Sequence, residues 1–147
     1  MSKIIVLGFL LMPFSLLFSN VFKDACLTNK ESKTMLQQKK LPGEIVYKKY
    51  CISCHQADGG GVPNISPPLL QTSFILGEKE TLIKIVLNGL KNVDINDQSY
   101  NNPMPALGSV LKDQQIADVL TYVRNSFGNK ASAVTAKEVK TVRSKTK

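Results

Sequence analysis

The sequence predicts an all-α domain, and three observations support this prediction. Apolar residues recur every three or four positions in three separate segments, which is the spacing of one face of a helix. No alternation of polar and apolar residues of the kind that marks a half-buried strand stands out, and neither does an internal repeat. The length of 147 residues leaves room for one domain of three to four main helices with flanking tails.

The first helix is expected to start after residues 42–43 and to carry a cysteine motif at its C-terminal end. The motif is Cys51-Ile-Ser-Cys54-His55, a Cys-x-x-Cys-His run, which is the attachment signal of c-type haem. On a helix end the two thiols would lie about one turn apart, within reach of the two vinyl groups of one porphyrin. His55 could then turn in to bind the iron. The motif therefore predicts one covalently attached haem c.

Three alternatives to haem attachment stay open at this point. A redox-active dithiol of the thioredoxin type would need a βαβ context, and the surrounding residues lack strand-like alternation. A structural zinc site needs four ligands, whereas the chain has one His and a single further cysteine, Cys26. The third alternative is chance occurrence of the five-residue pattern.

A glycine run and a proline segment follow the motif. The three glycines at 59–61 either let the backbone pass close to a flat cofactor or form a plain turn. Residues 64–70 contain Pro67 and Pro68 and should be extended. A ligating imidazole normally donates its other N–H group to a carbonyl or carboxylate. We therefore expect the carbonyl of Pro67, or that of Pro68, to accept from His55, the alternative being a simple kink in a loop.

A second helix is predicted from Glu78 to Asn88, with Gly89 as its C-terminal stop. Residues 90–110 are predicted to form a long loop, and loops of this length inside a small domain are usually functional. Of the four methionines, Met104 alone lies in the expected folded domain, and prolines flank it. We expect Met104 to be the second axial ligand of the iron, against the alternative that it only fills the core.

The third helix is predicted from Asp113 to Phe127, where the apolar periodicity is strongest, and it should cross the first helix. Residues 129–147 are expected to be a basic tail. Thr135 and Glu138 resemble a capping box that would start a short helix. From Arg143 onward the chain is expected to fray.

The N-terminus is predicted to direct export. Residues 1–22 combine an early lysine with a long apolar run, which is typical of an export signal or, if uncut, a membrane anchor over residues 4–22. Residues 23–42 are polar and suggest a tether, in which Cys26 is a candidate for lipidation. We therefore expect the protein in the periplasm or on the outer face of the cytoplasmic membrane, soluble or anchored.

The net charge of +8 does not favour a nucleic-acid partner. Residues 43–128 hold seven Lys/Arg and eight Asp/Glu, a net charge of −1, so the basic excess lies in the flanking segments.

Taken in order, these motifs resemble those of a class I cytochrome c domain over residues 43–128. The resemblance implies an all-α fold in which one haem lies in a hydrophobic crevice, and it adds Leu69 to the haem-binding residues. More narrowly, the chain is similar to small bacterial c-type cytochromes that serve periplasmic dehydrogenases or oxidases, as separate subunits or fused modules. The matching positions are Gly43, Tyr47 and the motif at 51–55, then Pro67 and Leu69, then Tyr100, Met104 and Pro105, and finally residues 116–124.

The predicted function is one-electron transfer through this haem, with His55 and Met104 bound throughout, in a respiratory or dehydrogenase-linked chain. A dehydrogenase or a terminal oxidase would be the redox partner, and the protein by itself is expected to be monomeric. One alternative is a permanently docked subunit of a larger oxidoreductase. Another is a haem peroxidase or gas sensor with an open iron position, which would require Met104 to leave, and the sequence offers no spare His.

Overall fold

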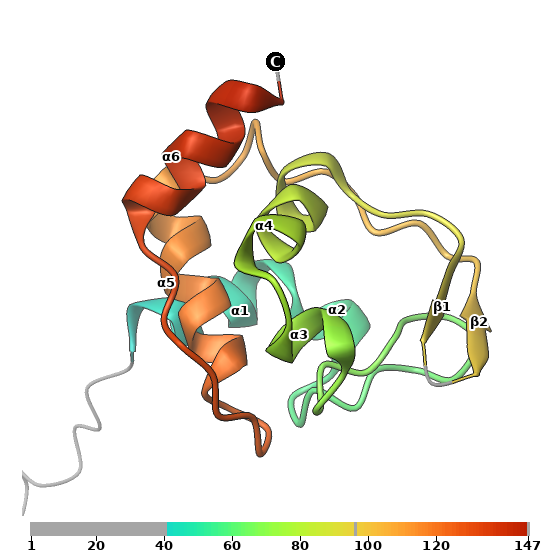
Figure 1. The fold of residues 1–147 in the computed structure, drawn as a ribbon. Coiled ribbons are helices and arrows are strands. Elements are labelled where there is room, and N and C mark those ends of the chain that lie inside the picture. Colours follow the sequence, from blue (N-terminus) through green and yellow to red (C-terminus); the bar gives the residue numbers. More distant parts are fainter. Residues whose placement is uncertain (1–40, 96, 147) are drawn as a thin grey trace, which may run out of the picture. The chain divides into compact units, whose positions relative to one another are not determined.

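The computed structural model describes residues 41–95 and 97–146. The predicted export segment, the tether as far as residue 40, and Cys26 lie outside the described residues. The described part is mainly helical, which confirms the predicted all-α class (Figure 1). Its elements are α1 (Pro42–Tyr50), α2 (Ile52–His55), α3 (Ser73–Leu76), α4 (Lys79–Asn88), β1 (Val93–Ile95), β2 (Gln98–Tyr100), α5 (Asp113–Arg124) and α6 (Ala136–Lys145).

Helices α1 and α5 cross at very short range, and a glycine makes this possible. Gly43 is buried in the first turn of α1. A Cβ atom at this position would overlap the Asp118 carbonyl oxygen and lie 2.6 Å from the Cβ of Tyr122. Beyond the crossing, the rings of Tyr47, Tyr122 and Phe127 pack together with centroids 5.3–5.8 Å apart. The crossing sets the position of α1, and so of the cysteine motif that follows it.

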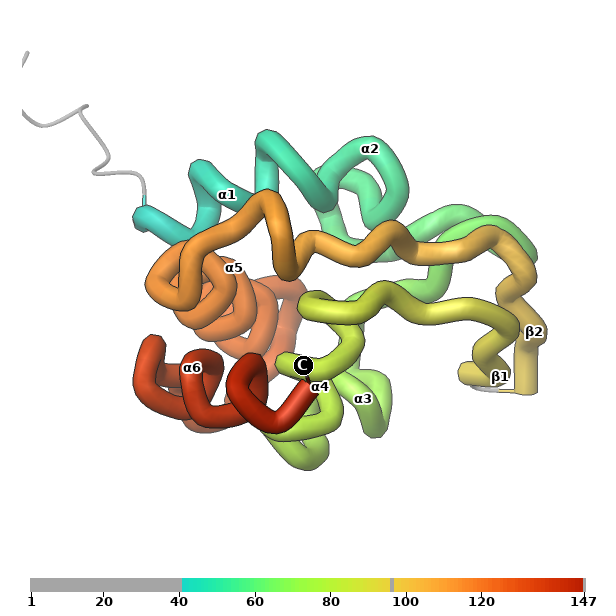
Figure 2. The backbone as a smooth tube through the Cα atoms, turned by 90° about the horizontal axis from the view of Figure 1, so that it is seen from above, coloured from blue at the N-terminus to red at the C-terminus, as the bar shows by residue number. Residues whose placement is uncertain are grey.

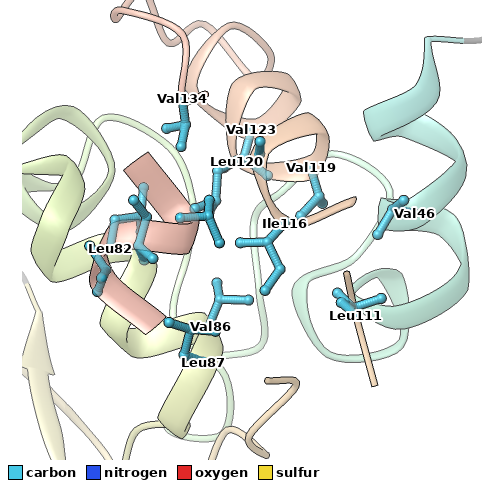
Figure 3. Packing of buried hydrophobic residues seen from close by; sticks show 14 of the residues in the cluster. Val46, Leu82, Val86, Leu87, Leu111, Ile116, Val119, Leu120, Val123 and Val134 are labelled. Atoms are coloured by element: carbon cyan, nitrogen blue, oxygen red, sulfur yellow. The ribbon is translucent and has the colours of Figure 1, made fainter. Parts of the chain in front are cut away.

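The apolar core lies between α1, α4, α5 and α6. Helix α5 turns a continuous apolar face inward, because its buried residues fall at i, i+3 and i+4. Figure 3 shows the side chains of α4 and α5 gathered in this core. Among the buried residues are Val46, Leu82, Val86, Leu87, Leu111, Ile116, Val119, Leu120, Val123 and Val134.

Helix α6, in the segment expected to be a basic tail, packs on α4 and α5. Val139 and Val142 are buried against them. The predicted capping box is formed, with the Thr135 hydroxyl and the Glu138 carboxylate bonded reciprocally to backbone N–H groups. The expectation that the chain frays from Arg143 is wrong as far as Lys145, where α6 ends. The Arg143 guanidinium is paired with Asp113 at 2.7 Å and donates to the carbonyls of Gly108 and Leu111, because α6 runs back along the start of α5.

Two further expectations about the helices need correction. The cysteine motif does not end α1, because Cys51 has φ −117° and separates α1 from the short helix α2. Helix α5 ends at Arg124, before Phe127. Phe127 takes a positive φ of 56° and its ring packs on Tyr47. Tertiary packing therefore ends the helix at Arg124, although the apolar periodicity continues to Phe127.

The loop predicted at 90–110 contains a small antiparallel hairpin that the sequence did not reveal. Its strands β1 and β2 pair Val93 with Tyr100 and Ile95 with Gln98. Strands of three residues are too short to display a clear alternation. Both views of the described residues place this hairpin at the opposite end from α6 (Figures 1 and 2). Within the described residues, no helix is both long enough and apolar enough to cross a membrane.

Candidate haem-binding site

The two thiols of the motif lie at the start of α2 and within it, because Cys51 is the N-cap residue and Cys54 is part of the helix. The Cys51 N–H donates to the Tyr47 carbonyl at 2.9 Å, and the His55 N–H donates to the Cys51 carbonyl at 2.9 Å, so residues 51–55 form one helical turn. Cys51 is half-buried, Cys54 is exposed, and both are free thiols. Burial raises the pKa of the Cys51 thiol to about 11, with a smaller contribution from Cys54. Because both thiols are free, both sulfurs are available for covalent attachment.

The His55 imidazole is buried and oriented by the proline segment. Its Nδ1 lies 2.9 Å from the Pro67 carbonyl oxygen, so the acceptor is Pro67 and not Pro68. Because a carbonyl can only accept, Nδ1 carries the hydrogen and Nε2 keeps its lone pair. Burial lowers the pKa of His55, and the hydrogen bond to Pro67 offsets part of that shift. The geometry thus presents a neutral imidazole with one nitrogen free to ligate a metal.

Glycines bring the proline segment to His55. A Cβ atom at Gly61 would lie 2.7 Å from the Pro67 carbonyl group, and a Cβ at Gly59 would lie 2.7 Å from the Phe127 ring. The Leu69 N–H donates to the Gly59 carbonyl at 2.8 Å. In the described structure, Gly59 and Gly61 therefore allow close contacts with the Phe127 ring and the Pro67 backbone. A plain turn would not require such contacts.

A tyrosine and a strained residue complete this turn, and neither was predicted as a site residue. Gln56 directly follows His55 and has φ 63° and ψ 170°, a region that is essentially restricted to glycine. The Tyr47 hydroxyl donates to the Gln56 carbonyl at 2.6 Å. Burial raises the pKa of Tyr47, so the hydroxyl stays protonated and keeps donating. In the sequence, Tyr47 is simply one residue of the apolar stripe of α1, and no signal indicates that its hydroxyl bonds to Gln56.

Met104 is brought back to the end of α4 by a backbone bridge. The Met104 N–H donates to the Leu90 carbonyl at 2.8 Å, and the Leu90 N–H donates to the Met104 carbonyl at 3.1 Å. Gly89, with φ 78°, permits this approach, because a Cβ at that position would lie 2.5 Å from the Met104 carbonyl oxygen. The loop at 90–110 is therefore also attached at Met104, and not only at its ends.

Two adjoining hollows meet at the predicted ligands. The inner one has an almost wholly apolar lining. Residues from the motif and from the loop at 90–110 line the outer one. Four of the six predicted site residues, Cys51, His55, Pro67 and Met104, line both hollows, whereas Leu69 lines only the inner one and Cys54 only the outer one.

This donor set fits a covalently attached haem. Two free thiols, an imidazole nitrogen with a free lone pair and a thioether sulfur meet at an apolar cavity. A protein-only metal site has no comparable support, because the described residues contain no group of three or more His, Cys, Asp or Glu that could hold a metal ion.

Two polar residues hold the cavity walls, and neither was predicted from the sequence. The Asn129 amide donates to the carbonyls of Leu69 and Val123, at 2.8 Å each, and so ties the proline segment to α5. The Arg124 guanidinium is buried and donates to three backbone carbonyls, those of Ile75, Gly77 and Ser132. Most of these bonds join residues far apart in the chain, so no local pattern indicates them.

Comparisons with known proteins agree with this arrangement. The family model for Cytochrome c matches residues 41–127. The chain is 38% identical over 105 residues to the cytochrome c subunit of a quinone alcohol dehydrogenase from Gluconacetobacter polyoxogenes, covering 70% of this chain and 22% of that protein. It is 38% identical over 104 residues to the gluconate 2-dehydrogenase cytochrome c subunit of Pantoea cypripedii, covering 69% of this chain and 24% of that protein.

A smaller relative is covered more completely. The chain is 35% identical over 105 residues to cytochrome c-552 from Thermus thermophilus, covering 65% of this chain and 79% of that protein. The chain thus spans about a quarter or less of the length of the two dehydrogenase subunits but most of the length of the small cytochrome.

Proposed function

This chain belongs to the cytochrome c family and is an electron-transfer protein with a covalently bound haem c, and we propose that His55 and Met104 are the axial ligands of its iron. One observation carries the proposal. Both side chains line the same two hollows as the Cys51 thiol, and the Pro67 carbonyl leaves Nε2 of His55 free. The thioethers would form at Cys51 and Cys54.

The chain's own residues would hold and tune the cofactor. Pro67 orients His55 and strengthens it as a ligand, because an imidazole that donates to a carbonyl is a better base. The apolar lining that includes Leu82, Val86 and Leu120 keeps water away. When bound, the haem supplies one-electron chemistry by changing the oxidation state of its iron. A thioether ligand and an apolar lining both favour the reduced state, so we expect a higher reduction potential than that of bis-histidine haem.

The cavity does not favour an enzyme with an open iron position. Within the described structure, the residues that line the two hollows include no carboxylate and no imidazole besides His55. A peroxidase would need a group near the iron to move protons.

We also propose a dehydrogenase as electron donor and a location outside the cytoplasm. The first proposal rests on relatives that are named as cytochrome c subunits of dehydrogenases. The second rests on the apolar segment at 1–22, acting as an export signal or an anchor, with lipidation of Cys26 as another means of attachment. The haem domain itself is proposed to be monomeric.

Replacing Met104 by alanine tests the axial ligand. The ferric protein should lose the weak methionine–iron absorbance near the red edge of its spectrum, its reduction potential should fall, and the reduced iron should bind carbon monoxide. Leu107→Ala is the matched control, because Leu107 also lines both hollows but offers no ligand atom. An unchanged potential and absorbance in Met104→Ala would remove Met104 from the ligand set.

Replacing the motif cysteines tests attachment separately. Cys51→Ser and Cys54→Ser should each leave only one thioether, which is seen as a shift of the reduced absorbance band, while the remaining thioether keeps the haem attached under denaturing conditions. Retention of both thioethers in either variant would contradict the assignment.

The electron donor can be sought by purifying the tagged protein from membranes and testing the purified fraction for dehydrogenase activity.

A further inference from the structure

Most of the chain around the outer hollow carries no charged side chain. Three segments lack Asp, Glu, Lys and Arg altogether, at residues 50–57, 59–77 and 98–111, and these supply most of the lining of the outer hollow. We call the exposed lining residues of this hollow the neutral collar. It consists of Ser53, Cys54, Asn92, Asn102, Pro103 and Pro105.

Two exposed apolar side chains lie in the segment that contains the lining residues Ser66 and Pro67. Ile65, next to the lining residue Ser66, is 51% exposed, and Leu70 in the same segment is 39% exposed. The charged residues within three positions of a lining residue are of mixed sign: Lys48, Lys49 and Lys91 are balanced by Asp58, Asp94 and Asp97. The local charge of the collar is therefore close to zero.

The positive charge of the described chain is concentrated elsewhere. Lys137, Lys140 and Lys145 are exposed on α6, and both views place α6 at the opposite end from the hairpin β1–β2 (Figures 1 and 2). Val93 and Tyr100 of that hairpin line the outer hollow. At ordinary ionic strength the field of an exposed charge decays over about 8–10 Å. A partner docked at the collar would therefore experience little of the electrostatic field of the net positive charge.

We propose that the electron leaves or enters through the neutral collar, and that the collar docks on an uncharged, apolar patch around the redox centre of another protein. This inference rests on the proposed electron-transfer function. An acidic or basic partner patch would lose its hydration at the collar without gaining an opposite charge in return. Small apolar contacts without charge steering suit a short-lived complex.

A second copy of the holoprotein is a suitable probe, because it presents the same uncharged collar side chains next to its own haem. Electron self-exchange between reduced and oxidised copies can be followed by NMR line broadening. Ser53→Asp and Asn102→Asp each add one negative charge to the collar, and Ser144→Asp adds the same charge on α6. Each change lowers the formal net charge of the polypeptide by one, from +8 to +7.

The two ideas about docking predict opposite signs. If the collars meet, the collar variants bring two negative charges together and should slow self-exchange by about twofold at low salt, whereas Ser144→Asp should not slow it. If net charge governs the encounter, all three variants should accelerate self-exchange, because two less positive molecules repel less. Acceleration by the collar variants would overturn the proposal. Two collar variants on different segments guard against a folding or attachment defect in one of them.

Small oxidants provide an independent check. The reduced wild-type protein should react with the ferricyanide trianion and with the tris(phenanthroline)cobalt trication at rates that change by less than about twofold between low and high salt. A fall of about tenfold or more in the ferricyanide rate, with a rise in the cobalt rate, would mean that the net charge acts at the electron exit and would refute the collar. Failure to react with either oxidant at any salt concentration would instead contradict the electron-transfer function.

Discussion

Replacement of Gly43 by alanine is expected to destabilise the fold at the crossing of α1 and α5. The new methyl group would overlap the Asp118 carbonyl oxygen and lie 2.6 Å from the Cβ of Tyr122. Two of its neighbours are backbone atoms of α5, so no side-chain rotation relieves the overlap and the helices must move apart. Overpacking of this kind costs about 3 kcal/mol at the upper end of its range.

The helix propensity of alanine offsets part of this loss. Alanine is better than glycine inside a helix by about 1 kcal/mol, which leaves a net loss of roughly 2 kcal/mol. For a domain of this size, that loss lowers the melting temperature by roughly 8–16 °C. Urea unfolding and thermal melting of the holoprotein, followed by far-ultraviolet circular dichroism, measure both quantities.

Gly60→Ala is the matched control for Gly43→Ala. Gly60 is exposed, and the atom nearest to its added Cβ would be Oδ1 of Asp58 at 3.1 Å, at the end of a side chain that can move. Its stability should therefore stay within about 0.5 kcal/mol of the wild type. The reasoning about the helix crossing fails if Gly43→Ala is as stable as the wild type or more stable.

Gln56→Gly should raise the free energy of unfolding by about 1 kcal/mol, since it relieves a backbone conformation that only glycine adopts easily; a lower urea midpoint would contradict this. The backbone N–H of Thr135, and then the Lys79 ammonium, hold the pKa of Glu138 at about 2, below its ordinary value of 4.5. The stability from this carboxylate is thus present above pH 4.5 and is lost as the pH falls to about 2. Glu138→Gln should be less stable than the wild type at neutral pH and match it near pH 2, and a gap independent of pH would refute the assignment. Arg124→Met should lose about 3 kcal/mol or more in urea unfolding because three carbonyls lose a charged donor, and Arg124→Lys should recover only part of this; near-neutral behaviour of Arg124→Met would show that water replaces the guanidinium.

The part of the site that neighbouring residues form could be predicted from the sequence. Residues 51–55 hold two thiols and an imidazole within one helical turn, so their relation depends little on the rest of the chain. Met104 was found by elimination, because the other methionines lie at residues 1, 12 and 35. Its position at the cavity depends on the bridge to Leu90, across thirteen intervening residues that contain the unpredicted hairpin.

Asn129 and Arg124 could not be predicted because they act across long stretches of chain. Asn129 bonds to Leu69 and Arg124 to Ile75, at separations of 60 and 49 residues. Such polar side chains look like ordinary surface residues in a sequence. Only the folded chain shows that they are buried and that carbonyls face them.

By itself, the sequence determined the helical class, the order of the main helices and the covalent haem motif, because helix periodicity and the spacing of residues 51–55 are properties of a few consecutive residues. The tertiary structure decided that Pro67 and not Pro68 faces His55, that α6 belongs to the packed core, and that Gly43 lets α1 touch α5. These outcomes depend on how closely distant segments can approach one another. That closeness is set by glycine positions and by satisfied backbone groups, which no short window of sequence contains.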